Sequence, residues 1–346
     1  MVDITARTIC DSINPSGNRV ITMLTRYPKF VHGEHLRHRS FSFSVSSSRA
    51  IPVAKNLEEV RSDALRAGPI WWGREQKGMQ SGEELSDEPI AEVDWHGPLP
   101  DERPLLSKRQ LAKEQWRSAA LTAAGIAQNL HLRGVHKSIV NRILEPFLHV
   151  NVLVSGTTSG WMNFFGLRLD RAAQLEIRAL AEACWKVWNE SRPRQLRPEE
   201  WHLPFVDQQY VDEVNRIAIA QDEWAMNKIA EDLERKVSTA CCAHLSYMSF
   251  GSEPRRMTVS QCVALHDRLV GSVPIHASPA EHQATPDEQV GYEIQVRISS
   301  ENHLNGLNLS TWRHSDQSGN FDPGWRQYRK MLPGEAIAPL PEGYVP

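Results

Sequence analysis

The sequence predicts a mixed α/β or α+β fold in which helices dominate. Apolar residues recur at helical spacing in several long segments, and the clearest is 172–189, where Leu175, Leu180 and Cys184 fall near one face. Strand patterns are fewer, with alternation toward β at 151–155. A chain of 346 residues can bury one large core or two modest ones. We expect a single catalytic domain over residues 1–346.

Further helices are expected on both sides of that segment. Their ends are marked by Gly134, by Pro146 and by the N-cap candidate Thr258. They cover residues 105–131, 135–147, 211–237 and 259–269.

Three segments lack a regular pattern. Residues 74–104 are rich in Gly, Pro, Asp and Glu and are expected to form a long surface excursion. Residues 191–204 are typical of a loop, and the tail 315–346 is expected to be irregular.

Composition excludes several classes of protein. The net charge of −3 argues against a general nucleic-acid coat. No apolar run approaches the roughly 20 residues that span a bilayer, and the N-terminus lacks a signal-peptide pattern, so we expect a cytoplasmic protein. The five cysteines are odd in number and form no Cys-x-x-Cys pair, which disfavours a disulfide framework or a zinc site.

The most informative segment is 34–52. Arg37, His38 and Arg39 stand together and are followed by a run of hydroxyl side chains that ends at Arg49. Hydroxyls and amides can cradle an anion, and a guanidinium can close on it with paired hydrogen bonds. Taken alone, an Arg-His-Arg triplet is more often part of a solvated basic loop.

Two other clusters carry polar side chains in an ordered pattern. The first contains Arg142 and the box 161–170, which by itself would be an aromatic core patch with an Arg-Asp pair. The second is 276–284, in which two histidines flank a glutamate. His276 and His282 are six residues apart with a proline between them, so no helical metal-binding face forms and no metal is expected.

The order of these boxes resembles the flavin-dependent thymidylate synthase family, in a phage-type variant. Residues 37–49 are similar to the Arg-His-Arg signature, residues 163–168 to an Asn-Phe-x-x-Leu-Arg box, and residues 276–282 to a His-x-Ser-Pro-x-Glu-His box. The last box precedes the signature in shorter cellular members and follows it here, so the order looks rearranged. The resemblance extends over about 25–330.

The resemblance implies a mixed fold with a central sheet and many helices, a homotetramer with active sites at subunit interfaces, and bound FAD. The implied reaction is reductive methylation of a deoxypyrimidine monophosphate at C5, with dUMP converted to dTMP. Methylenetetrahydrofolate and NADPH would be co-substrates. Neither a membrane nor direct nucleic-acid binding is expected, and a phage-encoded enzyme would act in the host cytoplasm.

The resemblance also implies roles for individual residues. Arg168 would stabilise negative charge on the pyrimidine, with Ser47 as the other expected catalytic residue. Phosphate contacts are expected from Ser47, Arg49 and Arg142. Cofactor contacts, mainly to the flavin, are expected from Arg37, His38, Arg39, Asn163, His276 and His282.

Several positions depart from the family pattern. Ser44 and Val45 replace Asn and Glu, Thr157–Ser159 replace Asn-Ala-Arg, and Glu34 replaces a glutamine. A carboxylate at Glu34 can accept from the exocyclic amine of cytosine. The alternative is therefore a phage-type enzyme that methylates or hydroxymethylates dCMP or dUMP to make a modified DNA precursor. A rival of another class, a non-catalytic nucleotide- or nucleic-acid-binding protein, would show steeply salt-dependent DNA binding.

Overall fold

The fold was analysed in a computed structural model of the chain. The structure describes residues 2–78, 80, 82–89, 106–247, 256–297 and 304–335. Most of the expected surface excursion at 74–104, and the end of the tail from 336, lie outside the described residues.

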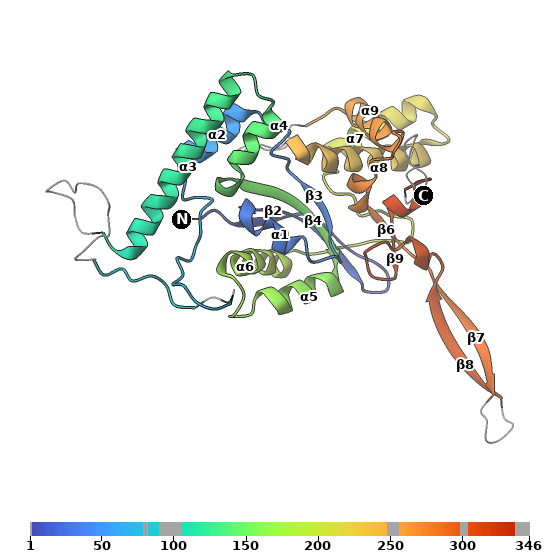
Figure 1. Ribbon diagram of the computed structural model, residues 1–346. Helices are drawn as coiled ribbons and strands as arrows, with labels where there is room; N and C mark the ends of the chain where they lie inside the picture. The colour runs from blue at the N-terminus through green and yellow to red at the C-terminus, as the bar shows by residue number, and fades with distance from the viewer. Residues whose placement is uncertain are drawn as a thin grey trace, which may run out of the picture.

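A five-stranded sheet forms the centre of the molecule (Figure 1). Its strands pair antiparallel, except that β5 runs parallel to β1. β4 is buried along its whole length, as expected for a strand covered on both faces. In spatial order the strands are β3 (Ser42–Val45), β4 (His149–Thr157), β2 (Arg19–Pro28), β1 (Thr5–Ile13) and β5 (Arg194–Gln195). The mixed α/β class predicted from the sequence is confirmed.

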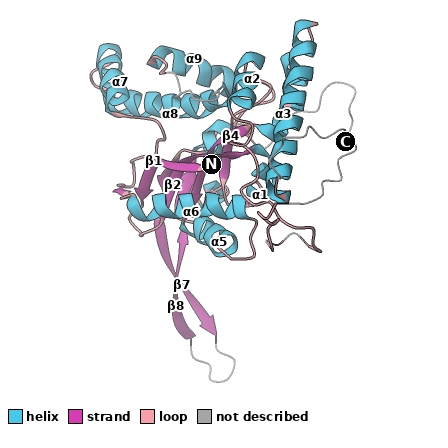
Figure 2. Ribbon diagram, turned by 90° about the vertical axis from the view of Figure 1, so that its left-hand side faces the viewer, coloured by secondary structure: helices cyan, strands magenta, loops and turns pink. Residues whose placement is uncertain are grey.

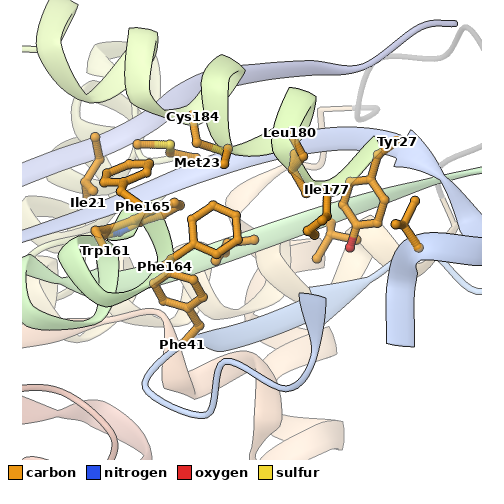
Figure 3. Packing of buried hydrophobic residues seen from close by; sticks show 14 of the residues in the cluster. Ile21, Met23, Tyr27, Phe41, Trp161, Phe164, Phe165, Ile177, Leu180 and Cys184 are labelled. Atoms are coloured by element: carbon orange, nitrogen blue, oxygen red, sulfur yellow. The ribbon is translucent and has the colours of Figure 1, made fainter. Parts of the chain in front are cut away.

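Two helices, α5 (Thr158–Arg168) and α6 (Leu175–Glu190), cover one face of this sheet. Side chains of β2 and β4 alternate, so that Ile21 and Met23 point to these helices while Leu24 points to the opposite face. Figure 3 shows the resulting core, in which aromatic rings of α5 and aliphatic side chains of α6 pack over β2. The helix predicted at 172–189 is confirmed as α6.

Three helices, α7 (Gln208–Gln221), α8 (Met226–His244) and α9 (Val259–Val270), lie on the opposite face of the sheet (Figure 2). The single helix predicted over 211–237 is wrong, because the chain breaks between α7 and α8. Asp222 ends the first helix and its carboxylate accepts the backbone N–H groups of Trp224 and Ala225. The helix predicted at 259–269 is confirmed, with Thr258 and Gln261 forming a capping box.

The chain between β3 and β4 forms a smaller helical layer. α3 (Lys108–Leu132) packs on α2 (Val53–Ser62) and confirms the helix predicted at 105–131; its end is followed by Gly134, at a φ of 81°. The helix predicted over 135–147, broken around Pro146, is present only as short turns. That segment holds the single turn α4 (Lys137–Val140) and 3₁₀ turns at Asn141–Ile143 and Glu145–Phe147, because Pro146 cannot donate a helical hydrogen bond. A further short helix, α1 (His32–His35), follows β2.

The tail is more ordered than the sequence predicted. Trp325 is fully buried in β9 (Trp325–Gln327), which pairs with β6 (Ala284–Pro286). The prediction of an irregular tail from residue 315 is therefore wrong for this part of the described residues. A second hairpin, β7 (Gln289–Arg297) with β8 (Leu304–Trp312), stands away from the body in both views.

Candidate functional site

The signature segment runs from α1 through β3 into a turn. Pairing with β4 places Phe43 beside Val154 and Ser44 beside Leu153, so Phe43 faces the core while Ser44 faces α8. The backbone then bends, and the N–H groups of Ala50 and Ile51 both donate to the carbonyl of Ser47. This turn brings residues 46–49 to the wall of a cavity.

The cavity has a volume of about 1050 Å³, room for a nucleotide together with part of a second ligand. Its walls come from the signature turn, the segment before β4, the end of α8, α9 and the box that begins at His276. The polar and charged lining residues are Lys29, His32, Ser44, Ser46, Ser47, Ser48, Arg49, Arg142, Glu145, Ser246, Arg268, His276 and Ser278.

Cations outnumber acids around this cavity. Lys29 donates to Glu145 at 2.6 Å and to Ser48 at 3.0 Å, and Ser48 also bonds Glu145. Burial alone would raise the pKa of Glu145, but the hydrogen bonds from Lys29 and Ser48 hold it below its usual value. Glu145 therefore stays ionised and neutralises Lys29.

Three arginines of the cavity keep their charge available. Within the described part of the chain, no carboxylate lies in ion-pair contact with Arg49, Arg142 or Arg268, and all three are exposed. Beside the hydroxyl of Ser47, they form a cradle with the chemistry of an anion site.

A second group of predicted residues lies near the end of α5. Arg168 donates from Nε to Nε2 of His38 at 3.0 Å, and its Nη1 lies 4.0 Å from a carboxylate oxygen of Glu34. Burial, and then the charge of Arg168, lower the pKa of His38 to about 4, so the ring is neutral and accepts this hydrogen bond. Arg37, Arg39 and Asn163 are exposed on the same two elements, α1 with its following turn and α5.

An aromatic layer lies beside this second group. The ring of His35 contacts Phe43, with centroids 5.1 Å apart, and Phe164 at 5.4 Å, and Phe164 in turn contacts His38 at 4.9 Å. Phe43 lines the cavity, whereas Arg168, His38 and Glu34 do not. One chain therefore does not bring all the predicted site residues into one cavity.

The two histidines of the box at 276–282 occupy different environments. His276 is exposed and lines the cavity. His282 is fully buried, and its two ring nitrogens contact Ser155 at 2.8 Å and Ser44 at 2.9 Å. Any contribution of His282 within its own subunit therefore reaches the cavity through Ser44. Among the described residues, no group of three His, Cys, Asp or Glu side chains is placed to hold a metal ion.

Sequence reasoning missed three charged residues of the cavity. Lys29 precedes the signature, Glu145 lies in the predicted helix at 135–147, and Arg268 lies in the predicted helix at 259–269. Several basic residues lie near Lys29 in the sequence, which is only a weak indication of an anion site. Nothing in the helical pattern of α9 marks Arg268, because only the fold brings α9 to the signature turn.

Comparison with known proteins identifies the family of the chain. The model of the thymidylate synthase complementing protein family matches residues 18–194, just over half of the chain. The chain therefore belongs to this family, that of the flavin-dependent thymidylate synthases, and is a thymidylate synthase-like methyltransferase of nucleotide biosynthesis.

Among solved structures, the chain is similar to a UMP/dUMP methylase, PolB from Streptomyces cacaoi, bound with 5-Br UMP. The TM-score is 0.34 at 17% sequence identity, over 55% of this chain and 90% of that one. No curated protein sequence matches the chain. No helix of the described residues is both long and apolar enough to cross a membrane.

Proposed function

We propose that this chain is an FAD-dependent enzyme that converts dUMP to dTMP, taking the carbon from methylenetetrahydrofolate and electrons from NADPH. The observation that carries the proposal is the cavity, where arginines with no carboxylate partner among the described residues form an anion cradle with the signature hydroxyls, in a chain of this family. Arg49, Arg142 and Ser47 would hold the 5′-phosphate by charge-assisted hydrogen bonds.

The residues expected at the flavin fit such a cofactor chemically. FAD carries a diphosphate, and within the described part of the chain Arg37 and Arg39 have no acidic partner. Asn163 is exposed on α5 and can donate to or accept from a flavin ring, and His276 adds a polar group at the cavity wall. When bound, FAD would supply the hydride chemistry, while the protein supplies orientation and charge.

Arg168 would act on the pyrimidine. Its guanidinium is held by His38 and Glu34, which restricts its rotation. A fixed cation stabilises negative charge that develops on a ring carbonyl as the base is activated. The carboxylate of Glu34 partly neutralises the charge of Arg168. The two residues together would therefore set the positive charge that the base meets.

The proposed reaction does not require a nucleophilic thiol. None of the five cysteines lines the cavity. Burial raises the pKa of Cys10 to about 11 and raises those of Cys184 and Cys242 further, which keeps these thiols protonated and unreactive.

The distribution of the site residues supports an assembly of several subunits. Arg168, His38 and Glu34 do not line the cavity of their own chain, so a complete site would combine the cavity of one subunit with the Arg168 group of another. This arrangement accords with the homotetramer that the sequence resemblance implies, which we include in the proposal.

One observation favours a second substrate. Glu34 lies beside Arg168, the residue proposed to contact the base. A carboxylate there could accept a hydrogen bond from the amino group of cytosine. The second candidate is therefore C5 methylation or hydroxymethylation of dCMP.

The flavin and the nucleotide are tested together in one experiment. Purified protein should bind FAD, release it on denaturation, and oxidise NADPH faster when dUMP and methylenetetrahydrofolate are present. The proposal would be refuted if the protein cannot be loaded with FAD. It would also be refuted if no pyrimidine monophosphate changes the rate of NADPH oxidation.

A further inference from the structure

A continuous chain of buried hydrogen bonds runs from the cavity across the face of the sheet on which α8 packs. It begins at Ser44, whose Oγ lies 2.9 Å from Nε2 of His282. Nδ1 of His282 lies 2.8 Å from Oγ of Ser155, which lies 2.5 Å from Oγ1 of Thr22.

The chain continues to a second histidine. Thr22 lies 2.8 Å from Nε2 of His202, and Nδ1 of His202 lies 2.9 Å from Oγ of Ser12. Both histidines, Ser155, Thr22 and Ser12 have no exposed surface. Of these six residues, Ser44 alone lines the cavity.

Both imidazoles are neutral. Burial lowers the pKa of His282 to about 3, and burial together with the charge of Arg194 lowers that of His202 to about 3. A neutral imidazole carries one N–H, so it donates on one side and accepts on the other. Each hydroxyl likewise has one proton to donate.

This proton count allows two arrangements in which every contact of the chain contains one proton. In the first, both histidines carry the proton on Nδ1, Ser44 donates to His282, and only its lone pairs face the cavity. In the second, both histidines carry the proton on Nε2 and Ser44 accepts from His282, so its own proton is free to donate into the cavity. The two mixed arrangements are unfavourable for different reasons. If His282 carries the proton on Nδ1 and His202 on Nε2, one buried hydroxyl proton has no acceptor. In the reverse case Ser155 and Thr22 both donate to histidines, and no proton lies between their oxygens, which are 2.5 Å apart.

We propose that Ser44 contacts a carbonyl oxygen of the pyrimidine ring and that His282, coupled through Ser155 and Thr22 to His202, fixes Ser44 as the donor. The inference rests on the proposed function. Ser44 precedes the phosphate-cradle residue Ser47 by three positions, roughly 10 Å of extended chain, which suits the separation of base from phosphate in one nucleotide. His282 is thus a positioning residue, and the coupling explains why a histidine outside the cavity belongs to the site.

Binding of dUMP to the flavin-free full-length protein tests the pairwise contacts. By calorimetry, Ser44→Ala should weaken dUMP binding about three- to tenfold, as expected for one neutral hydrogen bond, and should leave FAD affinity within twofold. His282→Gln should weaken dUMP binding similarly, but should add less than twofold in the Ser44→Ala background. His266→Gln, at another buried histidine that is bonded to Tyr328 and Asp267, serves as the control and should change dUMP affinity less than twofold.

Additive losses from Ser44→Ala and His282→Gln would overturn the inference, as would a loss of FAD affinity in place of dUMP affinity. If the His282 variant does not fold, nitrogen-15 resonances of the wild-type histidines provide the second test. In the dUMP complex, His282 and His202 should both carry the proton on Nε2. An Nδ1–H form at either residue would overturn the inference alone, whereas failure of dUMP to bind would overturn the proposed function as well.

Discussion

Nε of Arg168 donates a hydrogen bond to Nε2 of His38 at 3.0 Å, and this contact links the two most distinctive boxes of the sequence. One residue ends α5, and the other belongs to the turn after α1. His38 must be neutral to accept this bond. Burial, and then the charge of Arg168, lower the pKa of the His38 ring to about 4, so the ring is neutral at pH 7.

Arg168→Lys should therefore lower turnover more than nucleotide affinity. Lysine keeps the charge but loses the planar group that His38 orients, so the contact that strengthens in the transition state is weakened. We expect a fall in kcat of about a hundredfold, by analogy with the loss of other groups that stabilise a developing anion. Arg178→Lys, on the neighbouring α6 and paired with Glu182, is the matched control. A loss of affinity with unchanged turnover would assign Arg168 to ground-state binding.

Arg49→Ala should weaken dUMP binding. One charge-assisted hydrogen bond to phosphate contributes about 1.5–3 kcal/mol, so KM should rise by about one to two orders of magnitude. Arg117→Ala removes an arginine from the surface of α3, where it pairs with Glu114, and should leave KM unchanged. Steady-state kinetics with dUMP as the varied substrate measures both variants, and an unaltered KM in Arg49→Ala would remove this residue from the phosphate cradle.

Mixed assemblies test whether the site is shared between subunits. Arg49→Ala and Arg168→Ala subunits should each form poorly active homo-oligomers. If the two groups meet across an interface, refolding the variants together should restore activity, because some sites receive both native arginines. Activity of the mixture no higher than that of the separate variants would place the complete site within one chain.

Stability should fall as the pH is lowered below about 6.5. His202 and His282 have folded-state pKa values of about 3, below the ordinary value of 6.5, so the unfolded chain binds their protons first. Their contribution is complete above pH 6.5 and is lost as the pH falls toward 3. Each accounts for up to ~1.4 kcal/mol per pH unit in that window. Urea unfolding at several pH values should give a shallower dependence for His282→Gln, and an unchanged slope would contradict the burial of a neutral His282.

The tail should stabilise α5 through Asp322. Its carboxylate accepts from the backbone N–H of Ser159 at 3.2 Å and from the Ser159 hydroxyl, near the start of a helix whose N-cap side chain makes no capping bond. Asp322→Ala should cost about 1 kcal/mol of unfolding free energy, the usual effect of losing a helix cap. Asp316→Ala, at an exposed position of the same segment, should have no such effect in the same unfolding measurement.

The helices with continuous amphipathic patterns could be predicted from the sequence, whereas the central sheet largely could not. β4 is buried on both faces and so shows no alternation beyond a short stretch. The break after α7 was missed because Asp222 makes it with a side-chain cap and no glycine or proline marks it. β9 was missed because it is three residues long and pairs with a segment far away in sequence.

Part of the cavity lining was predictable from the boxes of the family signature. Ser47, Arg49, Arg142 and His276 do line one cavity. His202 could not have been found, because it reaches Thr22 only through a bridge between residues 202 and 284. Arg268 and Glu145 likewise join the cavity through packing of distant elements.

The most direct test is the product formed from each nucleotide. FAD-loaded enzyme should be incubated with methylenetetrahydrofolate, NADPH and either dUMP or dCMP, and the nucleotides then analysed by mass spectrometry. The proposed function predicts dTMP from dUMP and unchanged dCMP. Conversion of dCMP alone, or a product that carries a hydroxymethyl group, would contradict it.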